Sequence, residues 1–359
     1  MSSNLPPPRF WSPPPDPFKP PLPYQPGFTV PIARHTPPPP FGDRRHAPTN
    51  FHNLSAINLH TATQTEVVLA SPPLEADTLT PPPPGETATL TVLSPIAVSD
   101  DRGAQIVLCR ITPASGAPYR AAAKIFDPLY YPFAHPDASY VPQNIARLAD
   151  VAYSHEAAAY EHLQHRPDLP VPKYFGAWTF ELAVETPQGR RRRAVRVVVM
   201  EYVPGRSIRE IAESRVLAGG FSVEERLEVL AGALEAAVVV RHSGVDQRDL
   251  AGRNVILRET TGRDKATGEK EALKHRVVLI DFDTAEVTSL TLRGAHPHEL
   301  LPRPQNPMAL FWHDSLPEFE GWKPAEWEYG GSSVRRGWLR ERFGGRRGEE
   351  YEPVGELED

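Results

Sequence analysis

The second half of the chain places carboxylate and amide side chains beside short apolar runs. Asp249 and Asn254 lie five residues apart, directly before the apolar run 255–257. Asp281 and Asp283 follow a second apolar run. Oxygen atoms of carboxylates and amides are the ligands that Mg²⁺ prefers, and an aspartate can also accept the proton of an attacking hydroxyl. Together with a lysine for the phosphates, these residue types are those that phosphoryl transfer to a hydroxyl requires.

The segments that carry these residues resemble two motifs of the protein kinases. Residues 247–254 read Q-R-D-L-A-G-R-N, which is similar to the kinase catalytic loop H-R-D-L-x-x-x-N. Residues 277–283 read V-V-L-I-D-F-D, which is similar to the strand end that carries D-F-G. The resemblance implies that Asp249 accepts the proton of the substrate hydroxyl and that Asn254 and Asp281 hold magnesium.

A third segment resembles the kinase strand V-A-I-K, which carries the phosphate-binding lysine. Residues 121–126 read A-A-A-K-I-F. The resemblance implies that Lys124 contacts the α- and β-phosphates of ATP, while Ala122 lies against the adenine. Glu156, on the predicted helix that follows, is the expected ion-pair partner of Lys124. Glu161, slightly more than one helical turn further along, is the alternative partner.

A fourth segment resembles the kinase hinge between the two lobes. Residues 198–205 read V-V-M-E-Y-V-P-G. By this resemblance Met200 guards the pocket behind the adenine, and backbone groups of Glu201 and Val203 form hydrogen bonds with the adenine edge. The motifs occur in the kinase order, and their arrangement is similar to that of fungal protein-kinase-like proteins with a curtailed large lobe. The resemblance implies ATP and Mg²⁺ as cofactors.

Three features depart from the protein kinase pattern. Gln247 stands in place of the loop histidine, whose hydrogen bonds brace the loop, and a glutamine amide can take over part of that bracing. Asp283 replaces glycine, an ending that is more similar to aminoglycoside and choline phosphotransferases, where it would be a second metal ligand. The loop expected over the phosphates holds only Gly103, beside Asp100 and Asp101, although such a loop is usually rich in glycine.

The sequence therefore favours an ATP-dependent phosphotransferase that moves the γ-phosphate of Mg-ATP to a hydroxyl acceptor, with a protein as the expected acceptor. Two alternatives stay open. One is a small-molecule kinase of the aminoglycoside or choline phosphotransferase type. The other is a pseudokinase that binds nucleotide as a scaffold.

The elements that must position these residues follow from the spacing of apolar side chains. Strands are predicted at 89–93, 105–112, 120–126, 176–182, 194–202, 254–257 and 276–282, and a helix at 144–164. Ser207 with Glu210, and Ser222 with Glu225, have the spacing of capping boxes that begin helices. The polar segment 258–275 links the last two strands. The predicted fold class is α+β, with a two-lobed protein-kinase-like fold and a shortened C-terminal lobe.

The predicted domains are a proline-rich, disordered tail at 1–88, an N-terminal lobe at 89–203, a C-terminal lobe at 204–345 and an acidic tail at 346–359. The first hundred residues hold 24 of the 42 prolines, which favours polyproline II or disordered structure. Within this tail, only residues 67–70 are apolar enough for a short strand. A partner that reads proline-rich ligands is a further interpretation of the tail.

Two other groups of residues have simple structural interpretations. The four arginines at 190–193 are expected on a solvated hairpin tip. Trp312, Trp322, Trp327 and Trp338 are expected to pack the last helices onto the C-terminal lobe.

Composition limits the partners and the compartment. A net charge of −6 and a pI near 6.1 do not suggest a nucleic-acid partner. No apolar run reaches the roughly eighteen residues of a membrane span, so no membrane partner is expected. The single cysteine, Cys109, excludes an internal disulfide and fits a reducing compartment. The first residues lack the basic and apolar regions of a secretory signal, which favours the cytoplasm or the nucleus.

Overall fold

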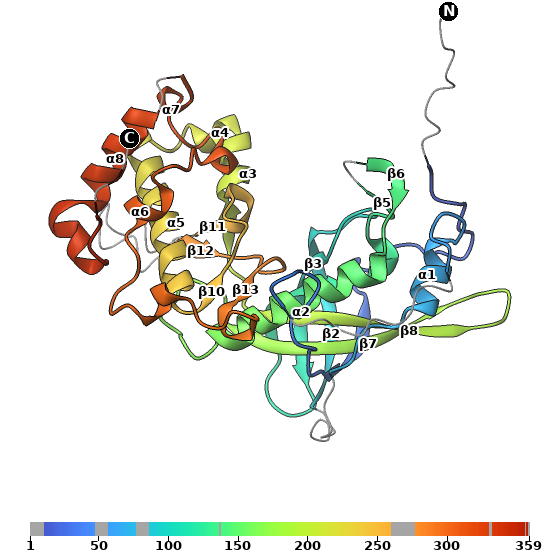
Figure 1. Cartoon of the computed structure of the whole chain (residues 1–359). Helices are drawn as coiled ribbons and strands as arrows, with labels where there is room; N and C mark the ends of the chain where they lie inside the picture. Colours follow the sequence, from blue (N-terminus) through green and yellow to red (C-terminus); the bar gives the residue numbers. More distant parts are fainter. Residues whose placement is uncertain are drawn as a thin grey trace, which may run out of the picture. The chain divides into compact units, whose positions relative to one another are not determined.

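The computed structural model describes residues 11–46, 57–76, 86–135, 138–259, 277–329, 332–355 and 357, and the chain forms two units (Figure 1). Unit 1 comprises Met1–Asp43, Pro48–Ala157 and Phe175–Tyr202, and unit 2 comprises Arg44–Ala47, Ala158–Tyr174 and Val203–Asp359. Antiparallel strands dominate unit 1 and helices dominate unit 2, so the fold is of the mixed α+β class. The last passage between the units, at 202/203, falls one residue before the lobe boundary expected from the sequence.

Unit 1 is built around a closed six-stranded barrel. Its strands are β1 (Thr29–Arg34), β2 (Thr87–Ala97), β3 (Gln105–Pro113), β4 (Tyr119–Phe126), β7 (Tyr174–Val184) and β8 (Arg191–Met200), in the order β1-β2-β3-β4-β8-β7. In β2 the buried Ala88, Leu90 and Val92 alternate with threonines, because successive side chains of a strand point to opposite faces. A small ribbon of β5 (Ala134–His135) and β6 (Ala138–Pro142) stands apart from the barrel order.

Strand β1 closes the barrel, and the prediction of a disordered tail at 1–88 is wrong for the part of that segment that the structure describes. β1 pairs with β2 on one side and with β7 on the other. Val30 and Ile32 of this strand are buried, and so are the rings of Tyr24 and Phe41 on either side of it. The prolines did not prevent folding because apolar residues between them bury against the barrel.

The residues expected as a short strand at 67–70 belong instead to helix α1 (Gln64–Ala70). Thr63 accepts a hydrogen bond from the amide of Glu66, and the Glu66 carboxylate accepts one from the amide of Thr63. This capping box, which the sequence interpretation overlooked, explains why the apolar residues begin a helix. The predicted helix at 144–164 is present as α2 (Ile145–Leu163).

Arg193 is the exception in the arginine run that the sequence placed on a solvated tip. The side chains of Arg190 and Arg192 are 73% and 78% exposed, as predicted. The side chain of Arg193 is buried and forms an ion pair with the fully buried Asp127, which also accepts a hydrogen bond from Tyr24. The two-residue period of β8 points this one arginine inward, where Asp127 balances its charge.

Unit 2 contains helices α3 (Ile208–Glu213), α4 (Arg215–Ala218) and α5 (Val223–His242). Both predicted capping boxes are confirmed, at Ser207 with Glu210 and at Ser222 with Glu225. The unit also contains a sheet of order β12-β11-β9, from β12 (Val277–Leu279), β11 (Val255–Arg258) and β9 (Gly205–Ser207), the last of which precedes α3. β10 (Val245–Asp246) pairs with β13 (Glu286–Val287). Gly205 has φ of 153°, and a Cβ there would lie 2.3 Å from the carbonyl of Leu257, so the pairing of β9 with β11 requires glycine.

The C-terminal part of unit 2 contains α6 (Pro307–Phe311), α7 (Glu326–Tyr329) and α8 (Ser332–Phe343). Trp312 and Trp322 are almost fully buried, and the Trp322 indole donates to the carbonyl of Arg226 on α5, which confirms their packing role. The predicted acidic tail is not a free tail over its described residues, because Tyr351 is buried and the amide of Glu352 donates to the carbonyl of Pro304.

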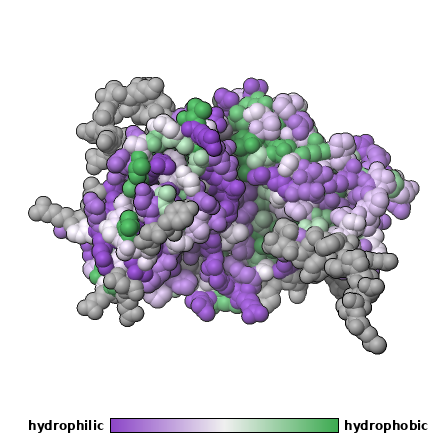
Figure 2. All heavy atoms as spheres, turned by 90° about the horizontal axis from the view of Figure 1, so that it is seen from above, coloured by the Kyte–Doolittle hydropathy of each residue, from purple (hydrophilic) through white to green (hydrophobic). Residues whose placement is uncertain are grey.

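Short 3-10 turns occur at Pro128–Tyr130, Gly252–Asn254, Thr288–Leu290, Pro297–Leu300, Pro317–Phe319 and Gly345–Glu350. Most of the polar link predicted at 258–275 lies outside the described residues. Within the described ranges, no helix combines the length and the apolar character that crossing a membrane requires. Figure 2 shows one face on which hydrophilic residues predominate and hydrophobic residues form smaller groups.

Candidate functional site

Lys124 and Glu156 form a buried ion pair in unit 1. The Lys124 ammonium lies 2.8 Å from the Glu156 carboxylate, and the side chains are 5% and 0% exposed. β4 carries the lysine and α2 carries the glutamate. The alternative partner, Glu161, is exposed and accepts a hydrogen bond from the hydroxyl of Tyr174. Removing each charge from water costs on the order of several kcal/mol, so a buried ion pair contributes little net stability to the fold. A buried pair of this kind therefore marks a candidate functional site.

The strand registers place other predicted nucleotide-binding residues of unit 1 close to Lys124. Ala122 lies opposite Met200 across the pairing of β4 with β8, and both side chains are buried. Lys124 itself lies opposite Ile106 at the start of β3. β8 ends at Met200, and Glu201 follows in a stretch without regular secondary structure. Ala122 and Met200 therefore occupy neighbouring positions on adjacent strands, and Glu201 directly follows the second of them.

In unit 2, Asp249 is held by two residues of its own loop. The Arg253 guanidinium donates to both carboxylate oxygens of Asp249, at 2.7 and 2.9 Å. The Asn254 amide donates to the backbone carbonyl of Asp249 at 2.9 Å and to its carboxylate at 2.8 Å. Arg253 also pairs with Glu318 at 2.7 Å. The orientation of the Asp249 carboxylate is thus fixed by charge-assisted hydrogen bonds.

Gln247 connects the loop of Asp249 with the strand end of Asp281. Its side-chain amide donates to the carbonyl of Ile280 at 2.5 Å, and the amide of Ile280 donates to the carbonyl of Asn254 at 2.9 Å. Gln247 is 5% exposed. The glutamine amide therefore does brace the loop, as the sequence interpretation allowed. The two segments that carry the predicted magnesium ligands lie side by side.

Each of these two segments contains a non-glycine residue with positive φ, and Asp101 and Leu316 are the other such residues in the described part of the chain. Arg248 has φ of 64° and Asp281 has φ of 66°, values that residues with a side chain adopt infrequently. Arg248 is held by its hydrogen bond to Glu286, and the backbone at Asp281 is held by the hydrogen bonds from Gln247. Strained residues of this kind cluster at functional sites, so the backbone itself marks the loop of Asp249 and the end of β12 as the candidate site of unit 2.

The chemistry of these side chains fits a magnesium ion. Asn254 is buried, and its amide nitrogen is directed to Asp249, so Oδ1 is the atom with which it could bind a metal. Asp281 and Asp283 add carboxylate oxygens at the neighbouring strand end. Hard oxygen donors of this number and type suit Mg²⁺, which commonly takes one or two carboxylates from the protein and further ligands from phosphate.

The sequence interpretation missed Glu286 as an organising residue. Its buried carboxylate receives Arg248 at 3.3 Å and Arg45 at 2.5 Å. The backbone carbonyl of Arg45 also accepts from the amide of Leu292 at 2.7 Å. No motif predicted these contacts, because Arg45 is distant from Glu286 in the sequence. The only indication in the sequence was a glutamate among the apolar residues of β13.

Comparison with known proteins gives a distant likeness to a protein kinase. No family model and no curated protein matches the chain. Among solved structures, the BubR1 kinase domain matches with a TM-score of 0.35 and 12% sequence identity. The match covers 56% of this chain and 49% of that chain, so it spans about half the length of the kinase domain.

Proposed function

We propose that this chain is an ATP-dependent phosphotransferase that transfers the γ-phosphate of Mg-ATP to a hydroxyl acceptor, with a protein as the expected acceptor. The buried ion pair of Lys124 and Glu156 carries the proposal. The glutamate fixes the ammonium group in a buried position, from which it can donate charge-assisted hydrogen bonds to phosphate oxygens. In the same proposal Ala122 lies against the adenine and Met200 guards the pocket behind it, while backbone groups of Glu201 and Val203 form hydrogen bonds with the adenine edge.

The residues of unit 2 supply the other requirements of the reaction. Asn254, Asp281 and Asp283 would hold Mg²⁺, which when bound neutralises charge on the phosphates. Asp249 orients the acceptor hydroxyl and accepts its proton, and the hydrogen bonds from Arg253 and Asn254 keep its carboxylate in one orientation. Phosphoryl transfer requires that these groups and Lys124 act on one Mg-ATP.

Two other functions each have an observation in their favour. Asp283 in place of glycine favours a small-molecule kinase of the aminoglycoside or choline phosphotransferase type. The contact of Arg253 with Asp249 favours a pseudokinase scaffold, because one guanidinium nitrogen donates to both oxygens of the residue that should accept the proton. Turnover with protein acceptors and with small-molecule acceptors separates both from a protein kinase.

Nucleotide binding tests the proposal directly. Mg-ATP at about 100 times its Kd should stabilise the full-length protein by about 2.7 kcal/mol. Lys124→Met and Glu156→Gln should remove most of this increment, since both alter the pair that positions the phosphates. Glu161→Gln is the matched control, because it removes an exposed carboxylate from the same helix. A wild-type protein whose unfolding is indifferent to millimolar Mg-ATP would overturn the proposal.

A further inference from the structure

The loop between β2 and β3, residues 98–104, lies beside the candidate phosphate-binding lysine and is acidic. β3 begins at Gln105, and the register places Ile106 opposite Lys124, so the loop ends two residues before the lysine's cross-strand neighbour. It carries Asp100 and Asp101 and no arginine or lysine other than Arg102. In the proposed function, a carboxylate here would repel the phosphates of ATP.

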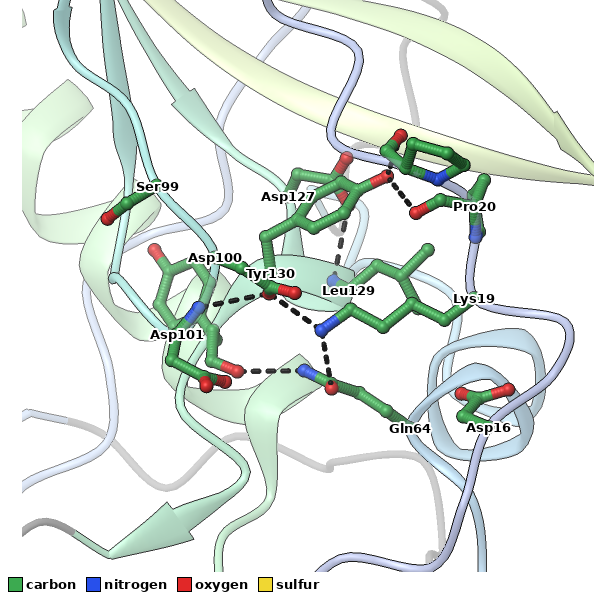
Figure 3. A network of polar contacts seen from close by, with 12 residues as sticks. Asp16, Lys19, Pro20, Gln64, Ser99, Asp100, Asp101, Asp127, Leu129 and Tyr130 are labelled. Atoms are coloured by element: carbon green, nitrogen blue, oxygen red, sulfur yellow. Dashed lines mark hydrogen bonds and ion pairs between the residues drawn. The ribbon is translucent and has the colours of Figure 1, made fainter.

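Lys19, from the N-terminal segment, pairs with one of these carboxylates. Its ammonium lies 2.6 Å from the carboxylate of Asp100 and 3.1 Å from the side-chain oxygen of Gln64 on α1. Figure 3 shows the Lys19 side chain alongside Tyr130, with its amine between Asp100 and Gln64. The Lys19 side chain is 17% exposed, whereas that of Asp100 is 53% exposed. The contact is therefore between a well-held lysine and a loop residue at the surface.

The segment around Lys19 is fastened to unit 1 at several points. The Tyr130 hydroxyl lies 3.1 and 3.0 Å from the carbonyls of Pro20 and Pro21, to which it donates. The Asp16 carboxylate accepts from the amide of Thr65 at 2.7 Å. These bonds hold the segment of Lys19 in place independently of Asp100. The fold therefore positions the Lys19 ammonium beside the loop 98–104.

The loop is also tied to the residues that follow β4. The amide of Arg102 donates to the carbonyl of Tyr130 at 3.1 Å, and the amide of Ser99 donates to the side chain of Gln105 at 2.9 Å. Because Tyr130 contacts both Arg102 and the segment of Lys19, the loop and the N-terminal segment share one support. An ordinary phosphate-covering loop uses several glycine amides, whereas this loop contains Gly103 alone.

We propose that Lys19 is a positioning residue for nucleotide binding: it neutralises Asp100 and holds the loop 98–104 in the conformation that accepts the phosphates of Mg-ATP. This inference rests on the proposed function. It assigns to the proline-rich N-terminal segment a part in the nucleotide site, through a lysine that stands far from every kinase-like motif in the sequence.

A double-mutant cycle tests the inference on the full chain. Lys19→Gln should weaken binding of Mg-ATP by about three- to tenfold, because it leaves the charge of Asp100 unbalanced near the phosphates. In an Asp100→Asn background the same substitution should change the Kd by less than about twofold. Asp101→Asn is the matched control, since it removes a carboxylate of the same loop that is not the partner of Lys19. In that background Lys19→Gln should have its full effect.

Amide hydrogen exchange without nucleotide gives a second readout. Lys19→Gln should speed exchange of the loop amides, including that of Arg102, while the melting temperature stays within a few degrees of wild type. Equal effects of Lys19→Gln in all three backgrounds, or unchanged loop exchange, would overturn the inference. If the wild-type protein binds no Mg-ATP, the proposed function fails. Faster loop exchange in Lys19→Gln would then confine Lys19 to holding the loop, and its role at a nucleotide would be rejected.

Discussion

The side chain of Gln247 reaches the backbone carbonyl of Ile280 at 2.5 Å, and this bond joins the loop of Asp249 to the strand end of Asp281. Thr284, beyond that strand end, returns the contact by donating its hydroxyl to the carbonyl of Gln247 at 3.3 Å. The two segments are thus held together by side chains as well as by the backbone bond from Ile280 to Asn254.

Gln247→Leu should therefore disturb both stability and turnover. Removing the amide leaves the half-buried carbonyl of Ile280 with one donor fewer, which we expect to cost about 1–3 kcal/mol of unfolding free energy. Gln247→His, which restores the kinase residue, should keep or raise the rate of phosphate transfer. Urea denaturation and ATP turnover measure the two effects. A leucine variant as stable and as active as wild type would show that this bond does not brace the loop.

Asp249→Asn should abolish phosphate transfer and leave the affinity for Mg-ATP nearly unchanged. The reason is that Asp249 acts on the acceptor hydroxyl, whereas Asn254 and Asp281 would hold the metal. Turnover should be measured with protein acceptors and with small-molecule acceptors, and Asp281→Asn is the comparison that should weaken Mg-ATP binding.

The acceptor experiment has distinct outcomes. Transfer to small hydroxyl compounds alone would favour the small-molecule kinase. Intact nucleotide binding with no turnover in wild type or in Asp249→Asn would favour the pseudokinase. Equal turnover by both proteins would falsify the role of Asp249.

Arg193→Met should destabilise unit 1 by about 3–5 kcal/mol, because it leaves the carboxylate of Asp127 buried without its cation. The Asp127 carboxylate would then keep only neutral donors, the Tyr24 hydroxyl and the amide of Leu129. Arg192→Met, at the neighbouring position on the same strand, is the matched control. The exposed ion pair of Arg192 with Glu181, at 2.8 Å, should contribute at most about 1 kcal/mol to the unfolding free energy. Equal unfolding free energies for the two variants would contradict this assignment.

Asp150 should make the stability depend on pH between about 4 and 7. Burial raises the pKa of Asp150 to about 7, even though the amide of Leu74 donates to its carboxylate at 3.1 Å. In this interval the folded state keeps a proton that the unfolded state has lost. The unfolding free energy therefore falls as pH rises toward 7, by up to about 4 kcal/mol.

Asp150→Asn should remove this slope. Comparing the variant with wild type at pH 5 and pH 8 isolates the contribution, because nearby groups such as His35 and Glu75 are present in both proteins. Parallel pH profiles for the two proteins would show that Asp150 is ionised in the folded state at pH 5.

Ile32→Ala should cost about 2–4 kcal/mol of unfolding free energy, because Ile32 is 2% exposed in the strand that closes the barrel. Thr29→Ala, at an exposed position of the same strand, should cost less than about 1 kcal/mol. Urea denaturation of the full-length variants measures both. If the isoleucine variant is as stable as the threonine variant, the N-terminal strand contributes nothing to the core.

The parts of the structure that depend on neighbours in the sequence could be predicted. Ser207 and Ser222 begin helices because each has a glutamate three residues later that completes a capping box. Glu156 pairs with Lys124 as expected from a strand that carries the lysine followed by a helix that carries the glutamate. The bracing role of Gln247 could also be predicted, because a glutamine amide can donate a hydrogen bond where the kinase histidine would.

The parts that depend on distant partners could not be predicted. β1 has only two buried apolar residues, Val30 and Ile32, and its register partner for Thr29 is Thr91, 62 residues later. Proline density outweighed this weak pattern. Arg193 looked like its exposed neighbours because only Asp127, from another strand end, makes its burial tolerable.

The closure of the barrel by β1 imposes an order on biosynthesis. β1 is made first, but its partner β7 follows only after β2, β3, β4 and α2 have been translated. At typical elongation rates that interval is on the order of ten seconds. During it the nascent strand has one of its two flanks unpaired, a state that invites association with other chains. Chaperone dependence and losses during rapid overexpression are therefore expected to reside in this N-terminal strand.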